Sequence, residues 1–244
     1  MPSVLESVGW GKPALDLVKH SMELDPDSPA VMHLRHSERP QVSASAGLHL
    51  PLTDKGETAA YEFGLNLSVD REYYIYHTRI DRAKKTAENI HKGILDNKGV
   101  SKIIGVIPVG YVVDFEEYRS IIFRELEGKE EVVGTRNFFD LWLSGMYPPS
   151  VVKPSPEFAQ QAASLMMRNL DEANPEDLHI WVSHDTWVAA FLRHWLKECS
   201  FNWVNFMDGF ILQFHKDHMM SFYRGKKRKV KYPSKWNFFS PLKH

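Results

Sequence analysis

The chain has 244 residues, 43% of them hydrophobic, which is enough to bury one large core. Its 30 basic and 31 acidic residues balance, so no global field attracts the protein to nucleic acid or to a membrane surface. The single cysteine, Cys199, excludes an internal disulfide and indicates a reducing compartment. Without a recognisable signal peptide or an apolar stretch long enough to span a bilayer, we expect a cytoplasmic protein.

Strand-like and helix-like segments alternate along the first half of the chain. Apolar residues recur every three or four positions in the helix-like segments, whereas aromatic and β-branched residues mark the strands. Thr53 is a suitable N-cap for the first of the helices. The predicted segments are a lead-in at 1–29, a strand at 30–35, a helix at 52–64, a strand at 71–78, a helix at 80–95 and a strand at 102–110.

The second half begins with residues 111–154, where aromatic clusters show no clear periodicity. We interpret this segment as an insertion that forms part of a lid, within a single domain spanning 1–244. The aromatic residues Phe138, Phe139, Trp142 and Tyr147 are assigned to the core rather than to a substrate wall. The later segments are a helix at 155–173, a strand at 178–183, a helix at 185–200, a hairpin over 210–225 and a solvated basic tail from Lys226.

This alternation predicts an α/β fold, a three-layer α/β/α sandwich with a mainly parallel sheet and an antiparallel hairpin at its edge. Ligands of such sheets bind beyond the carboxyl ends of the strands. Three strands are followed there by ionisable residues, namely Arg35 and His36, then Arg82, and finally His184 and Asp185. Guanidinium groups and helix amino termini both suit phosphate oxygens. If the strands are neighbours, the sequence predicts a phosphate pocket containing a nucleophilic imidazole.

Four motifs in order resemble the histidine phosphatase superfamily, the phosphoglycerate mutase-like fold, over roughly residues 30–215. They are Arg35-His36-Ser37 after the first strand, L-T-x-x-G at 52–56, R-A-x-x-T-A at 82–87 and Ser183-His184. The resemblance implies that His36 is the nucleophile and forms a phosphohistidine. It also implies that Arg35, Arg82 and His184 hold the phosphoryl oxygens, His184 as a cation. No cofactor is implied.

The general acid is open between two sets of residues. In the acid-phosphatase branch, a late H-D motif supplies the acid, and here this would be Asp185. In the mutase-like branch, a Glu after the R-A-x-x-T-A helix supplies it, and Glu116 and Glu117 are candidates of that kind. We favour Asp185 and keep the glutamates as alternatives. Arg39 stands at the position where the acid-phosphatase branch has a second phosphate-binding arginine.

One residue departs from the family signature, because Ser37 stands where the superfamily has glycine. Glycine there allows the backbone to approach phosphate closely. The Ser37 hydroxyl would either donate to the phosphate or crowd it. The next residue, Glu38, is assigned a structural role, pairing with Arg39 or another basic group.

The leading interpretation is a phosphatase acting on a small phosphomonoester or on a phosphorylated protein. A phosphoglycerate mutase-type phosphotransferase would use the same pocket. Because Ser37 departs from the signature, a third interpretation stays open, namely a weakly catalytic relative that binds a phosphorylated ligand. A metal hydrolase is the most remote, because the metal-binding spacings HxH and HExxH are absent and nearby arginines would repel a cation. Neither the substrate nor the oligomeric state is readable.

Overall fold

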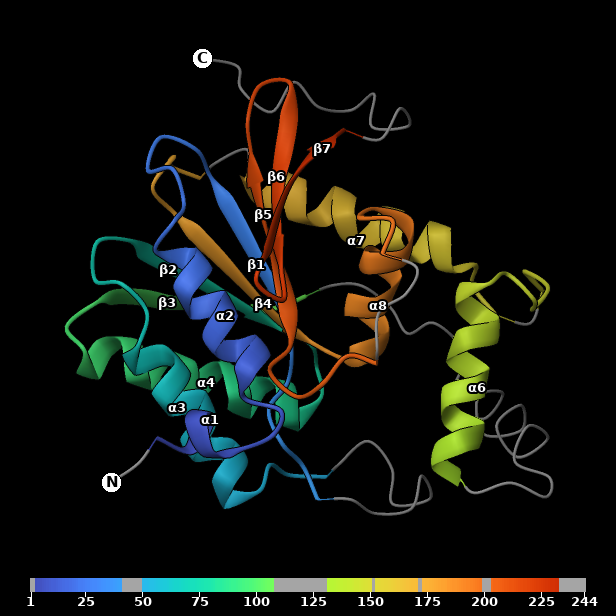
Figure 1. The fold of residues 1–244 in the computed structure, drawn as a ribbon, viewed down its shortest axis with the longest axis horizontal. Helices are drawn as coiled ribbons and strands as arrows, with labels where there is room; N and C mark the ends of the chain where they lie inside the picture. Colours follow the sequence, from blue (N-terminus) through green and yellow to red (C-terminus); the bar gives the residue numbers. More distant parts are fainter. Residues whose placement is uncertain are drawn as a thin grey trace.

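The structure is a computed structural model that describes residues 3–40, 50–107, 131–150, 152–170, 173–198 and 203–232; for 131–136 only the backbone is described. Within these ranges the chain forms a single seven-stranded sheet between two layers of helices (Figure 1). No helix in the described ranges combines the length and the apolar character needed to cross a bilayer.

The sheet has the strand order β3-β2-β4-β1-β5-β6-β7. The first four strands of this order run parallel to one another, and β5, β6 and β7 continue the sheet by antiparallel pairing. The predicted α/β fold with a mainly parallel sheet is therefore confirmed. The strands are β1 (Ala30–Arg35), β2 (Glu72–His77), β3 (Val100–Val106), β4 (Leu178–Ser183), β5 (Gly209–Phe214), β6 (His218–Tyr223) and β7 (Lys226–Lys231).

Helices cover both faces of the sheet, as the three-layer prediction requires. One hydrophobic core lies between the sheet and the layer made by α1 (Val4–Ser7), α2 (Lys12–Ser21), α3 (Asp54–Leu65) and α4 (Asp81–Asp96). The other lies beneath α6 (Glu131–Leu143), α7 (Ser155–Leu170) and α8 (Asp185–His194). Because both faces are buried, β1, β4 and β5 are apolar along most of their length rather than alternating.

The lead-in predicted at 1–29 is wrong in part, because it contains α1 and α2. Gly11 and Pro13 concealed α2 in the sequence, but glycine is acceptable at an N-cap and proline in a first helical turn. Helix α2 buries one face, including Leu17 and Val18, against the β5–β6 side of the sheet. Helix α2, which precedes β1 in the sequence, therefore belongs to the same layer as α3 and α4.

The hairpin β5–β6 is present, but it does not form the edge of the sheet. Residues Lys226–Lys231 of the basic tail form β7, which pairs with β6 through its backbone while its lysine and arginine side chains stay exposed. Charged side chains are a common feature of edge strands because they oppose further pairing. The side chains are solvated as predicted, but the backbone is a strand.

Only part of the predicted insertion at 111–154 can be followed, because residues 111–130 lie outside the described residues. Its second half forms α6, and Phe138 and Trp142 are buried in the core beneath it. Phe139 and Tyr147 are partly buried against the same core, so the described aromatic residues of this segment pack as predicted. Its role as a lid stays a prediction.

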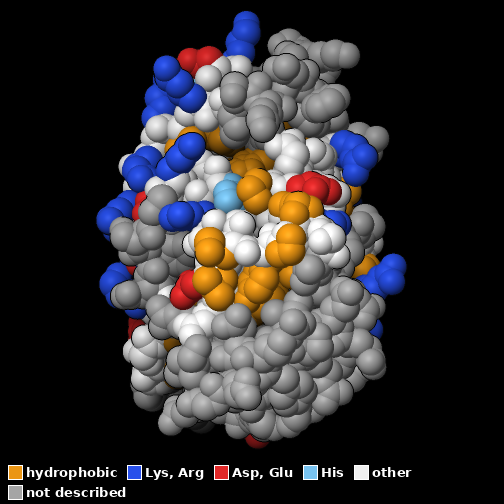
Figure 2. Space-filling model, turned by 90° about the vertical axis from the view of Figure 1, so that its right-hand side faces the viewer, with side chains coloured by type: hydrophobic (Ala, Val, Ile, Leu, Met, Phe, Trp, Pro, Cys, Tyr) orange, Lys and Arg blue, Asp and Glu red, His pale blue; other side chains and the backbone are white. Residues whose placement is uncertain are grey.

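The side of the molecule that carries α6 presents hydrophobic side chains gathered around a histidine side chain (Figure 2).

Candidate active site

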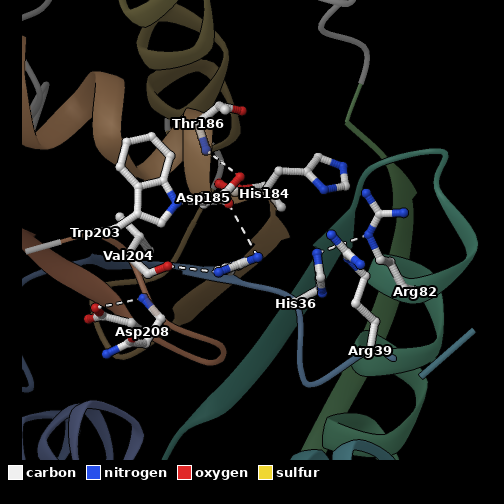
Figure 3. A network of polar contacts seen from close by, with 12 residues as sticks. His36, Arg39, Arg82, His184, Asp185, Thr186, Trp203, Val204 and Asp208 are labelled. Carbon is white, nitrogen blue, oxygen red and sulfur yellow. Dashed lines mark hydrogen bonds and ion pairs between the residues drawn. The ribbon is translucent and has the colours of Figure 1, made fainter. Parts of the chain in front are cut away.

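The parallel register of β1 and β4 brings the two histidine motifs together. Arg35 lies opposite Ser183 in the sheet, and the next residue, His36, donates its backbone N–H to Ser183 O over 2.9 Å. The rings of His36 and His184 therefore stand 5.5 Å apart, centroid to centroid, in an edge-to-face arrangement. Arg82 enters from the first turn of α4, which follows the neighbouring strand β2, and points toward His36 (Figure 3).

Both ring nitrogens of His36 have hydrogen-bond partners that define its state. Nδ1 donates to the backbone carbonyl of Ser37 over 2.7 Å, because a carbonyl can only accept. Nε2 accepts from Nε of Arg82 over 2.9 Å. Burial, together with the charges of Arg35 and Arg82, lowers the pKa of His36 well below its usual value. His36 is therefore a neutral imidazole with the lone pair on Nε2.

Arg35 is held by Asp185 at the start of α8 and by two residues of the loop before β5. One terminal nitrogen donates to Val204 O over 2.8 Å, and the other lies 3.2 Å from Oδ2 of Asp185. The guanidinium also stacks over the ring of Phe206, 4.4 Å from its centroid. These contacts fix the plane of the guanidinium beside His36, as phosphate binding requires of an arginine.

Asp185 lies at the start of α8 and accepts three polar contacts. Besides Arg35, its carboxylate accepts the indole N–H of Trp203 at 3.0 Å and the backbone N–H of Thr186 at 2.9 Å. Burial acts to raise the pKa of Asp185, but the charge of Arg35 and these hydrogen bonds outweigh it, so the pKa is lowered. Asp185 is thus an anchored carboxylate at neutral pH, whereas a general acid must hold a proton there.

His184 also sits in a position that disfavours its charge. Its Nε2 is hydrogen-bonded to Thr78 Oγ1, which comes from the end of β2, at 3.0 Å. Burial and the charge of Arg82 lower the pKa of His184 to about 3, although Asp185 acts in the opposite direction. The cationic His184 expected from the sequence is not the state that this arrangement favours, and a dianionic phosphate would have to supply the missing stabilisation.

Ser37 is fully buried, and its polar atoms bond within the protein. The hydroxyl donates to Gly56 O over 2.7 Å, and the backbone N–H donates to Thr86 Oγ1 over 3.0 Å. Thr86 in turn donates to Arg82 O over 2.7 Å, so one hydroxyl links the His36 loop to the α4 turn that carries Arg82. Gly56 is needed beside them, because a Cβ there would stand 2.3 Å from Glu38 O. Ser37 thus fits the loop with its hydroxyl donated to α3.

The remaining predicted residues divide into three groups. Arg39 points toward the same space as His36 and Arg82, and donates to its neighbour Pro40 O over 2.9 Å (Figure 3). Glu38 has a structural position as predicted, although its partners are the Trp10 indole and the Thr53 hydroxyl rather than a basic group. Glu116 and Glu117 lie outside the described residues.

Several residues beside the site were not assigned a role from the sequence. Thr86 belongs to the quoted R-A-x-x-T-A motif, so a signal for it was present. Thr78, Trp203 and Phe206 had none, because they lie in loops without periodicity and reach Arg35, Asp185 or His184 only through tertiary contacts.

A model of the histidine phosphatase superfamily (branch 1) matches residues 31–207, which include every described residue of this site except Trp10. The chain belongs to the histidine phosphatase superfamily. This confirms the resemblance inferred from the four motifs. None of the curated proteins compared with this chain matches it.

Solved structures of the phosphoglycerate mutase fold share the architecture of this superfamily member. Phosphoglycerate mutase from Bacillus anthracis superposes with a TM-score of 0.51 at 13% sequence identity, covering 86% of this chain and 95% of that chain. A mycobacterial glucosyl-3-phosphoglycerate phosphatase in complex with VO3 has a TM-score of 0.50 at 15% identity, covering 83% of this chain and 98% of that chain. At such identities the similarity establishes the fold.

Proposed function

We propose that this chain is a phosphatase that hydrolyses a phosphomonoester through a phosphohistidine on His36. The observation that carries the proposal is the state of that imidazole: Nδ1 donates to Ser37 O, and the lone pair on Nε2 faces Arg82. Membership of the superfamily and a fold shared with a phosphatase and a mutase support it.

In the first step, Nε2 of His36 attacks phosphorus and the bond from phosphorus to the ester oxygen breaks. Arg82 donates to the attacking nitrogen, so this hydrogen bond must first pass to a phosphoryl oxygen. Arg35, Arg39 and Arg82 then neutralise the charge that develops on the equatorial oxygens. The departing oxygen takes a proton from the general acid. The positive charge left on His36 is stabilised because Nδ1–H donates to Ser37 O.

In the second step, water attacks phosphorus, the P–N bond breaks and inorganic phosphate leaves. The residue that gave the proton takes it back from the water. The lowered pKa of Asp185 favours a positioning role for this carboxylate, holding Arg35, over proton donation. Glu116 and Glu117 are then the acid candidates that remain from the sequence.

Phosphate release from an aryl phosphate, without added metal, tests the proposal. We expect wild type to release phosphate and His36→Ala to release essentially none. His91→Ala, which alters a histidine on α4 hydrogen-bonded to Ser101, is the matched control and should keep activity. Acid-quenched wild type should carry an acid-labile phosphoryl group that is absent from His36→Ala. Activity that survives His36→Ala would overturn the mechanism, and conversion of phosphoglycerates without net phosphate release would assign the chain as a mutase.

A further inference from the structure

Two pairs of half-buried aromatic side chains are joined to the two histidine motifs of the site. Trp10 and Phe206 make an edge-to-face contact at 5.8 Å. Phe139 and Trp203 make a tilted contact at 6.0 Å. They come from the turn before α2, from α6 and from the loop before β5, and none of the four is fully buried. Hydrophobic side chains around a histidine also dominate the centre of the face in Figure 2.

The pair Trp10–Phe206 is attached to the catalytic motif itself. The Phe206 ring lies 6.0 Å from the ring of His36 and 4.4 Å from the Arg35 guanidinium carbon. Trp10 donates its indole N–H over 3.1 Å to Oε1 of Glu38, which lies two residues after the nucleophile His36. An aromatic wall is therefore held rigidly beside the imidazole that attacks.

The pair Phe139–Trp203 is joined to the second histidine motif, Ser183-His184-Asp185. The Trp203 indole donates to Asp185, which follows His184, and Phe139 packs on the core beneath α6. Trp187, in the first turn of α8, lies 6.5 Å from the His184 ring. In an in-line displacement the leaving oxygen stands opposite Nε2 of His36, so the leaving group must pass the side chains that border the phosphoryl site.

The charged groups here are mostly committed to each other or to the phosphate. Arg35 is paired with Asp185 and Val204 O, Arg82 with His36, and Arg39 with Pro40 O. Among the described residues, Arg79, which is exposed and directly follows Thr78, is an arginine that a second anionic group on a substrate would use. Aromatic side chains, in contrast, adjoin both histidine motifs.

We propose that the substrates are phosphomonoesters with a flat, apolar leaving group, that is, aryl phosphates, with Phe206 and Trp10 determining this specificity. The inference rests on the proposed function and names its substrate class. A ring stacked on these side chains gains apolar burial and aromatic contact, about 1–2 kcal/mol, whereas a small or anionic leaving group gains neither.

Binding of non-hydrolysable phosphonates tests this without the bias of leaving-group reactivity. Phenylphosphonate should bind wild type about tenfold more tightly than methylphosphonate. This affinity ratio corresponds to the stacking free energy given above. Phe206→Leu and Trp10→Leu should each reduce the ratio to about threefold or less. Tyr61→Leu, an aromatic residue on α3 that contacts Lys92, is the matched control and should leave the ratio unchanged. Melting curves establish that each variant is folded.

The outcomes separate this inference from the proposed function. Equal binding of the two phosphonates, with hydrolysis of simple esters intact, overturns only the aryl specificity. Tighter binding of phosphonoacetate than of phenylphosphonate, lost in Arg79→Gln, overturns it in favour of an anionic leaving group. No phosphonate binding and no hydrolysis of any ester would overturn both. A ratio that falls in the two aromatic variants and not in Tyr61→Leu supports the inference.

Discussion

Asp185 Oδ2 lies 3.2 Å from a terminal nitrogen of Arg35. Arg35 ends β1, whereas Asp185 begins α8 just after the neighbouring strand β4, far away in the sequence. The side chain of Arg35 is 12% exposed and that of Asp185 is 23% exposed, so solvent screens the pair only in part. The carboxylate therefore controls the direction in which the Arg35 fork can bind phosphate.

Asp185→Asn tests whether this residue positions Arg35 or donates the proton. Because a positioning residue acts on phosphate binding, we expect KM to rise about tenfold with similar losses for good and poor leaving groups. Steady-state kinetics with a series of esters whose leaving groups differ in pKa make the measurement. Asp16→Asn, which breaks an exposed pair with Lys12, is the control. A kcat loss of about 100-fold that grows as the leaving group becomes poorer would identify Asp185 as the acid instead.

Thr86→Val removes the hydroxyl that joins the His36 loop to α4. The buried Ser37 N–H would lose its acceptor, so we expect a loss of about 1–3 kcal/mol in the free energy of unfolding, together with reduced activity. Urea denaturation measures the loss. Thr58→Val is closely matched, because the Thr58 hydroxyl also donates to the carbonyl four residues earlier but is exposed on α3. Its effect should stay within about 0.5 kcal/mol, and equal losses in both variants would contradict the link.

Ser37→Ala separates the two roles that the sequence left open for this hydroxyl. Since it donates to Gly56 O, its removal should cost about 1 kcal/mol of stability and leave kcat/KM within about threefold of wild type. Denaturation and steady-state kinetics check the two parts. A fall in kcat/KM of more than about tenfold, with stability nearly unchanged, would show that the hydroxyl acts on the phosphate.

The stability of the protein should fall as the pH decreases below 6.5. His33 is fully buried beside Ser183, and burial lowers its pKa to about 3. Its folded pKa lies below the unfolded value, so the unfolded chain binds more protons between these values and folding weakens as pH falls through that window. Between pH 7 and 5 the loss from His33 is about 2 kcal/mol. His33→Gln should reduce the difference between urea denaturations at the two pH values by that amount, and an unchanged difference would contradict the assignment.

The fold class and the membership of the superfamily could both be predicted from the sequence. Alternating strand and helix periods recur along the chain, and those periods depend on local geometry that each segment carries with it. The carboxyl ends of parallel strands share one edge of a sheet, so the order of the motifs was enough to predict that His36, Arg82 and His184 would meet. The structure brings them together at hydrogen-bonding and ring-contact distances.

The states and contacts of the side chains in the site depend on tertiary packing. Asp185 occupies the H-D position that the sequence favoured for the general acid, and Arg35 and Trp203 contact its carboxylate. The Ser37 hydroxyl donates to Gly56 O. Phe206 contacts Arg35 although it lies in a loop whose sequence shows no periodicity. A periodic pattern identifies which face of an element is buried. Protonation states and hydroxyl directions depend instead on neighbours that approach through space, and those neighbours are set by how the layers pack.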